Sequence, residues 1–274
     1  RSRLLILFLI PLGFFLIREG MNYQRNISDY MLYKNQQKNI IIMGVTGDLI
    51  TALQRERGIS SIYASSGKEL DSIQVERTKV DTELERWLKD IAKVSYIKDE
   101  KDEIPQKLQA VRAIVDGRNF KSYIDVFDGY SAIIQSLLGI SNKAVNQPTI
   151  GGIGKVMSSM GIMMQAQEAI AATRGELGSI LAGNQKITDE SRLLDLIENF
   201  EAFEINLKSP AIIYSSGTRD VIMGLLTSDA YNLIEDALYD VFYKGMSGTS
   251  SSGYNVSYEE LWKQGTGLVN SINE

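Results

Sequence analysis

Two arginine–glycine pairs, Arg57-Gly58 and Arg174-Gly175, fall within predicted helices. An arginine that faces the inside of a helical bundle carries a large desolvation cost unless an anionic group meets it. The guanidinium is flat, permanently charged and offers paired parallel donors, whereas lysine presents a point charge. Two such arginines in corresponding halves of one chain predict that both meet the same small anion.

Counting along the helices places both arginines on apolar faces. Arg57 and Arg174 occupy the same place in two series with offsets of i, i+3, i+7, i+10 and i+14, which is the spacing of a packed helix face. A third helix places Arg77 in such a series. Arg55 lies roughly 200° around the helix from Arg57 and points elsewhere. The three series are Ile50, Leu53, Arg57, Ser60 and Ala64; Gln167, Ile170, Arg174, Leu177 and Leu181; and Leu70, Ile73, Arg77, Val80, Leu84, Trp87 and Ile91.

A structural role for these arginines stays open, because a buried arginine often reaches the bundle surface or pairs with a nearby carboxylate. Four carboxylates are close enough in sequence to be such partners: Glu56, Glu76, Asp81 and Glu176. The small residues that follow each arginine favour a ligand instead, because they leave room beside the guanidinium. Glycine inside a helix costs about 1 kcal/mol relative to alanine, so Gly58 and Gly175 require a close helix approach or space for a ligand.

The segment LQRERG at 53–58, a following helix of small residues and ERTKVD at 76–81 together resemble the NIT family of nitrate- and nitrite-sensing domains. The resemblance covers about residues 40–270. It implies an anion-binding role for Arg57 and, through TRGE at 173–176, for Arg174. Nitrate, a flat monoanion with three in-plane acceptor oxygens, matches the guanidinium donors. The remaining candidate ligand-binding residues are Arg55, Arg77, Ser61, Gly58 and Gly175, and Arg219 is an additional arginine without a supporting motif.

An unbroken apolar run, LLILFLIPLGFFLI at 4–17, is flanked by Arg1, Arg3 and Arg18. Fourteen helical residues span only about 21 Å, which is less than the roughly 30 Å hydrocarbon core. A partial transmembrane helix, a signal-peptide core and a buried helix therefore compete. We expect residues 1–18 to be a membrane anchor in the inner (cytoplasmic) membrane, and residues 19–274 to be a periplasmic or extracellular sensor domain.

The composition excludes several classes of site. The chain has no cysteine and no histidine, so thiol nucleophiles, Ser-His-Asp triads and zinc sites built on Cys or His are absent. No GxGxxG or Walker A sequence occurs, and GGIGK at 151–155 is interpreted as a linker. The net charge of −5 argues against a nucleic-acid partner. We expect no enzymatic activity, no metal and no cofactor, although a carboxylate-based enzyme stays open.

Helical periodicity and only four prolines predict an all-α protein with two up-and-down four-helix bundles that share long helices, after an N-terminal membrane-anchoring helix. The halves are expected at about 22–147 and 150–274. Asp189 and Ser228 are predicted helix N-caps, and Met160, Met163 and Met164 are predicted core residues. The expected helices are 22–66, 69–97, 102–116, 120–145, 153–184, 188–207, 210–244 with a break near Ser228, and 256–274.

The sequence thus predicts a membrane-anchored domain that binds nitrate or nitrite and signals across the membrane. The receptor class it favours is a bacterial chemoreceptor, and the expected form is a homodimer. Two alternatives stay open. One is a helical sensor of another small anion or of a carboxylate ligand. The other is a purely structural dimerisation bundle.

Overall fold

The computed structural model describes residues 2–92, 94–187, 189–214, 216–247 and 253–273. The part of the chain within these ranges is helical and contains no strand, which confirms the predicted all-α class. The elements are α1 (Ser2–Ser66), α2 (Leu70–Ile91), a short 3-10 turn η1 (Ser95–Ile97), α3 (Lys98–Asp116), α4 (Tyr123–Val145), α5 (Ile153–Gly183), α6 (Glu190–Leu207), α7 (Ser216–Leu225), α8 (Asp229–Ser247) and α9 (Tyr258–Asn273).

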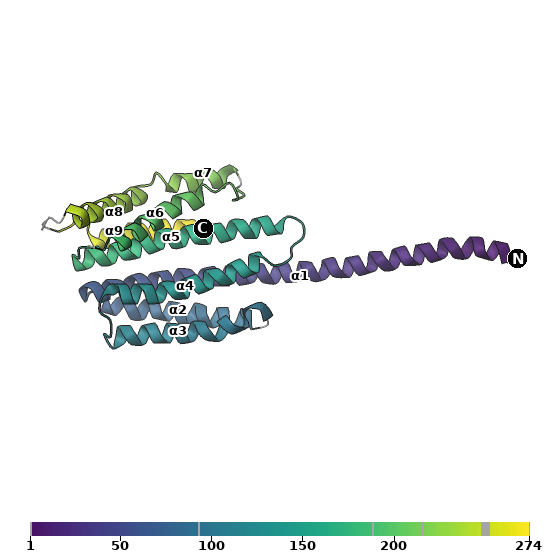
Figure 1. Cartoon of the computed structure of the whole chain (residues 1–274), viewed down its shortest axis with the longest axis horizontal. Coiled ribbons are helices and arrows are strands. Elements are labelled where there is room, and N and C mark those ends of the chain that lie inside the picture. The colour runs from purple at the N-terminus through teal and green to yellow at the C-terminus, as the bar shows by residue number, and fades with distance from the viewer. Residues whose placement is uncertain (1, 93, 188, 215, 248–252, 274) are drawn as a thin grey trace.

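The first helix, α1, is 65 residues long and extends well beyond the body of the molecule (Figure 1). Its exposed N-terminal part includes Phe14 and Ile17, and burial begins at Gln36. From there on, buried positions recur along the helix to Tyr63. Within the residues that the structure describes, no helix combines the length and the apolar character that crossing a membrane requires.

Two groups of helices enclose two apolar cores. In the first, α1 packs against α2 and α4, and α3 packs against α4. In the second, α5 packs against α6, α8 and α9. Trp87 and Tyr130 belong to the first core, and Phe203 and Ile234 to the second. The two groups meet where α1 packs along α5, so these two helices lie side by side in the middle of the molecule (Figure 1).

Local sequence signals account for several helix boundaries. The Asp189 side chain accepts a hydrogen bond from the Ser191 backbone N–H at the start of α6, and Ser228 Oγ accepts one from the Tyr231 N–H at the start of α8. Both predicted N-caps are therefore confirmed. The predicted helix over 210–244 is divided into α7 and α8, with the break at the predicted position.

The predicted apolar faces are largely confirmed. All five residues in the α5 series are buried, as are Ile50, Leu53, Arg57 and Ser60 in α1. In α2, Leu70 is exposed because it is the first residue of the helix. Most of the faces thus point inward, and they carry Arg57 and Arg174 with them.

Candidate functional site

The two predicted glycines, Gly58 and Gly175, lie where α1 and α5 pack closely together. A Cβ added to Gly175 would lie 3.7 Å from the Gly58 Cα and 3.4 Å from a ring carbon of Phe127. A Cβ on Gly58 would lie only 2.2 Å from Cη2 of Trp262, on α9. Glycine at 58 is therefore needed to seat Trp262 against α1, and this packing brings α1, α5 and α9 together around the arginines.

Arg57 is fully buried and paired with a carboxylate. Its Nη1 donates to Glu168 Oε1 at 2.5 Å and to Ser131 Oγ at 3.0 Å, and its Nη2 donates to Glu168 Oε2 at 3.3 Å. The guanidinium also lies 4.8 Å from the centre of the Phe127 ring. The partner comes from α5, more than a hundred residues along the chain, and not from a neighbouring turn.

Glu168 is itself buried, with 6% exposure. Besides Arg57, it accepts a hydrogen bond from Gln54 Nε2 at 2.9 Å. A buried carboxylate needs such compensation, because its desolvation is otherwise too costly. Glu168 therefore balances the charge of one arginine.

Arg174 is also fully buried, but it has no carboxylate partner among the described residues. Its Nη1 donates to Thr266 Oγ1 at 3.1 Å, and its Nη2 makes a long contact of 3.5 Å with the Gln54 carbonyl. The guanidinium lies 4.3 Å from the Trp262 ring centre. Burial, followed by the charges of Arg57 and Arg55, lowers the pKa of Arg174 to about 9. The group remains a cation at neutral pH and lacks a counter-ion.

Several buried polar atoms around this centre have no hydrogen-bond partner among the described residues. Three of them are donors: the Nε atoms of Arg57 and Arg174 and the hydroxyl of Ser61, one turn after Arg57. Gln54 Oε1 is unpartnered as well. Buried donors normally have hydrogen-bond partners, so several unpartnered N–H and O–H donors beside two guanidiniums are suited to bind an anion.

The other predicted arginines lie elsewhere. Arg55 donates to Asn270 Oδ1 on α9 at 2.7 Å, on a different side of α1 from Arg57. Arg77 pairs with Asp116 at 2.8 Å and lies 3.6 Å from Glu56, within the first helix group. Arg219 is exposed on α7. The structure thus brings together Arg57, Arg174, Ser61, Gly58 and Gly175, but not Arg77 or Arg219.

The carboxylates considered as neighbouring partners serve other cations. Glu56 accepts two hydrogen bonds from Arg112, at 2.7 and 2.8 Å, and one from the Tyr130 hydroxyl at 2.7 Å. Glu176 pairs with Arg192. Burial raises the pKa of Glu176 to about 7, while the Arg192 charge opposes this rise. Neither carboxylate forms an ion pair with Arg57 or Arg174, although the Arg57 charge also acts on Glu176.

Sequence reasoning missed four residues of this centre: Gln54, Glu168, Trp262 and Thr266. One signal could have identified Glu168, because it is a lone charge ahead of Arg174 in the run AQEAIAATRG. Trp262 and Thr266 of α9 stand in no sequence pattern that marks them, because their contacts with Arg174 depend on how α9 packs on α5.

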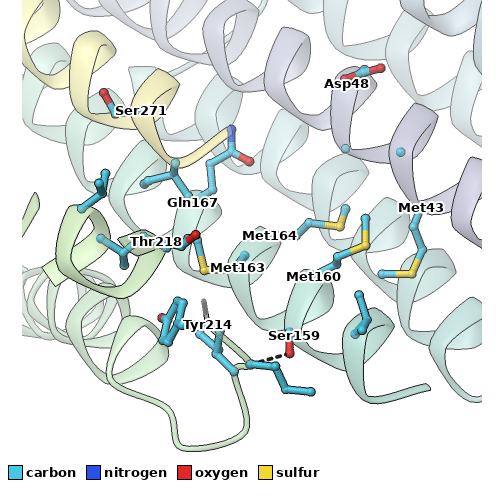
Figure 2. A pocket seen from close by; sticks show the side chains of 18 of the residues that line it. Met43, Asp48, Ser159, Met160, Met163, Met164, Gln167, Tyr214, Thr218 and Ser271 are labelled. Carbon is cyan, nitrogen blue, oxygen red and sulfur yellow. Dashed lines mark hydrogen bonds between the residues drawn. The ribbon is translucent and has the colours of Figure 1, made fainter. Parts of the chain in front are cut away.

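A separate cavity of about 1000 Å³ lies between α1, α5 and α7 (Figure 2). Met43, Met160, Met163 and Met164 line it, so the last three are cavity-lining residues as well as core residues. Ser159 Oγ accepts a hydrogen bond from the Ile213 N–H at 2.9 Å at its edge. Neither Arg57 nor Arg174 lines this cavity. The described residues contain no cluster of Asp and Glu suited to a metal ion.

The NIT family profile, described as nitrate and nitrite sensing, matches residues 48–211 and so covers more than half of the chain. Comparisons with curated proteins and with solved structures gave no match. The matched segment includes Arg57, Glu168 and Arg174. The chain belongs to the NIT family of nitrate- and nitrite-sensing domains.

Proposed function

We propose that this domain binds one nitrate or nitrite ion between Arg57 and Arg174. The observation that carries the proposal is the Arg174 guanidinium, which is fully buried, cationic and without a carboxylate partner in the described part of the chain. An anion at this point would offset the desolvation of Arg174 and its repulsion from Arg57 together. The chain thereby acts as a sensor and not as an enzyme.

The chemistry of the surrounding groups supports a small, flat anion. Arg174 offers donors in one plane, and the Ser61 hydroxyl and the Arg57 Nε are unpartnered. The Phe127 ring lies 4.8 Å from the Arg57 guanidinium and the Trp262 ring 4.3 Å from that of Arg174, so each cation has an aromatic face beside it. A planar ion with three acceptor oxygens suits such donors.

The contacts of Arg174 also support a route for signalling. Its side chain lies against α9 through Trp262 and Thr266, while Arg57 belongs to α1. An anion that draws Arg57 and Arg174 together would change the spacing of α1, α5 and α9. We propose that α1 carries this displacement toward its N-terminal end, because the helix continues unbroken to Ser2. A ligand must differ in affinity between the two arrangements to cause such a shift.

The finer assignments are proposals as well. We propose that each helix group acts as a four-helix bundle, that residues 1–18 anchor the chain in the inner membrane, and that residues 19–274 lie outside the cytoplasm. The apolar run at 4–17 supports the anchor. A bacterial chemoreceptor is the receptor class we favour, with a homodimer as its working form.

Thermal unfolding of the 274-residue chain in increasing nitrate tests the proposal. Stabilisation should follow mass action, at about 2.7 kcal/mol when nitrate exceeds the dissociation constant a hundredfold. Nitrite should act similarly, and an Arg219→Ala variant should respond as the unaltered chain does, because Arg219 is exposed on α7. Stabilisation by small carboxylates but not by nitrate would favour the alternative sensor. The absence of any shift with millimolar anions would refute anion sensing and leave the dimerisation bundle.

A further inference from the structure

The buried centre around Arg57 and Arg174 holds an unbalanced set of charges. Two guanidiniums are fully buried, and Glu168 is the carboxylate that pairs with one of them, Arg57. The other two buried carboxylates, Glu56 and Glu176, pair with arginines of their own. Arg55 and Glu76 also act on Arg174, with opposite signs, but neither is fully buried. Arg57, Arg174 and Glu168, the buried charges left within this centre, therefore sum to one positive charge.

From this balance we propose that Glu168 sets the valence of the anion that the site accepts, an inference that rests on the proposed function. With Glu168 ionised, one monoanion neutralises the centre. A dianion such as sulfate would leave a buried excess of negative charge beside Glu168, which is strongly unfavourable where the dielectric constant is low. The site therefore admits monoanions of suitable shape and excludes dianions.

Glu168 also competes with the ligand for Arg57. Its two oxygens take both Nη atoms of that guanidinium, at 2.5 and 3.3 Å, so an incoming anion meets donors that are already in use. No described carboxylate competes for Arg174, so its guanidinium is the first group that the incoming anion binds. Nitrate affinity is thus held below the value that two free guanidiniums would give, as suits a sensor that must release its ligand.

Gln54 makes the charge of Glu168 experimentally separable from its shape. Gln54 Nε2 donates to Glu168 Oε2, and Gln54 Oε1 is unpartnered. In a Glu168→Gln variant the new amide can still accept from Arg57, and rotation of the Gln54 amide lets its oxygen accept from the new NH₂ group. The substitution thus removes one negative charge while retaining a hydrogen-bonded side chain of the same size.

Isothermal titration of the 274-residue chain and its variants with nitrate and with sulfate tests the inference. We expect the unaltered chain to bind nitrate but not sulfate. We expect Glu168→Gln to bind nitrate about tenfold more tightly or better, a gain of about 1.4 kcal/mol, and to bind sulfate as well. The matched control is Glu176→Gln, which removes another buried carboxylate of α5 and should leave sulfate excluded. Glu168→Asp keeps the charge and should also exclude sulfate.

The outcomes separate the inference from the proposed function. If the unaltered chain binds nitrate while Glu168→Gln binds it equally or more weakly and rejects sulfate, Glu168 only positions Arg57 and the inference falls alone. If the unaltered chain ignores nitrate but Glu168→Gln gains sulfate binding, the charge role stands and the nitrate function falls. If Glu168→Gln does not fold without anions, sulfate in the refolding buffer should rescue it. Failure of that rescue, or sulfate binding by Glu168→Asp, overturns the inference.

Discussion

The two buried arginines should respond in opposite ways to the same substitution. Arg174→Met should raise the thermal stability of the anion-free protein, and Arg57→Met should lower it. Both guanidiniums are fully buried, but among the described residues only Arg57 has a carboxylate partner. The comparison therefore isolates the effect of an uncompensated buried charge.

The magnitude for Arg174 follows from its surroundings. The fall of the Arg174 pKa from its ordinary value to about 9 corresponds to a penalty of about 5 kcal/mol for the charged form in the folded state. The penalty applies in full below about pH 9 and is relieved only as the pH rises from there toward the ordinary pKa of arginine. Methionine gives up the contact with Trp262, worth about 2 kcal/mol when desolvated, and a hydrogen bond to Thr266 worth about 1 kcal/mol. A net gain of about 2 kcal/mol is expected, which raises Tm by about 4–8 °C.

Arg57→Met should act in the other direction because it leaves Glu168 buried with Gln54 as its remaining hydrogen-bond donor. Breaking a buried pair in this way costs about 3–5 kcal/mol, so Tm should fall on the order of 10 °C. A double variant, Arg57→Met with Glu168→Leu, should recover much of the loss, because an apolar pair replaces the ion pair.

Differential scanning calorimetry at pH 7 without nitrate measures these changes, and nitrate titration checks that both single variants lose binding. The reasoning would be refuted if Arg174→Met destabilised the protein as much as Arg57→Met. Arg174 would then have compensation in the folded protein equal to that of Arg57.

Three further predictions address the surroundings of the site. Gly58→Ala should lower stability by about 1–3 kcal/mol through overpacking and should weaken nitrate binding, because its Cβ would clash with Trp262. A Cβ at Gly44 has nothing within 4 Å, so Gly44→Ala should stabilise α1 slightly, and chemical denaturation compares the two variants. Glu176→Gln should make stability depend less on pH, because folding raises the Glu176 pKa from 4.5 to about 7 and the unaltered protein therefore loses up to about 3 kcal/mol of stability as the pH rises between these values. Denaturant midpoints at pH 4.5 and 7 measure this loss, and an equal loss in the variant and the unaltered protein would contradict the prediction. Arg55→Ala should change nitrate affinity by less than about tenfold, about 1.4 kcal/mol, because Arg55 bonds to Asn270 and not to the buried centre; titration calorimetry would contradict this with a complete loss of binding.

The sequence alone was sufficient for the all-helical class, two helix caps and the burial of two arginines. It was wrong at some helix ends: the helix expected over 69–97 ends at Ile91, and the one expected from residue 22 begins at Ser2. Periodicity is a local property, so the faces that carry Arg57 and Arg174 could be counted before any packing was known. The Asp189 and Ser228 caps depend on hydrogen bonds within three residues and were equally accessible. The ERG segment also indicated the NIT family, which the profile match confirms.

Only the tertiary structure decided which arginine is compensated. The carboxylates nearest in sequence, Glu56 and Glu176, pair with Arg112 and Arg192, while Arg57 takes its partner from another helix. Ion pairs between helices depend on the register in which α1 packs along α5, and that register follows from side-chain packing throughout both cores. The same packing places Trp262 of α9 against Arg174 and leaves that guanidinium without a counter-ion among the residues that the structure describes. Helical periodicity determines that a charge is buried, whereas the helices packed around it determine whether it is neutralised.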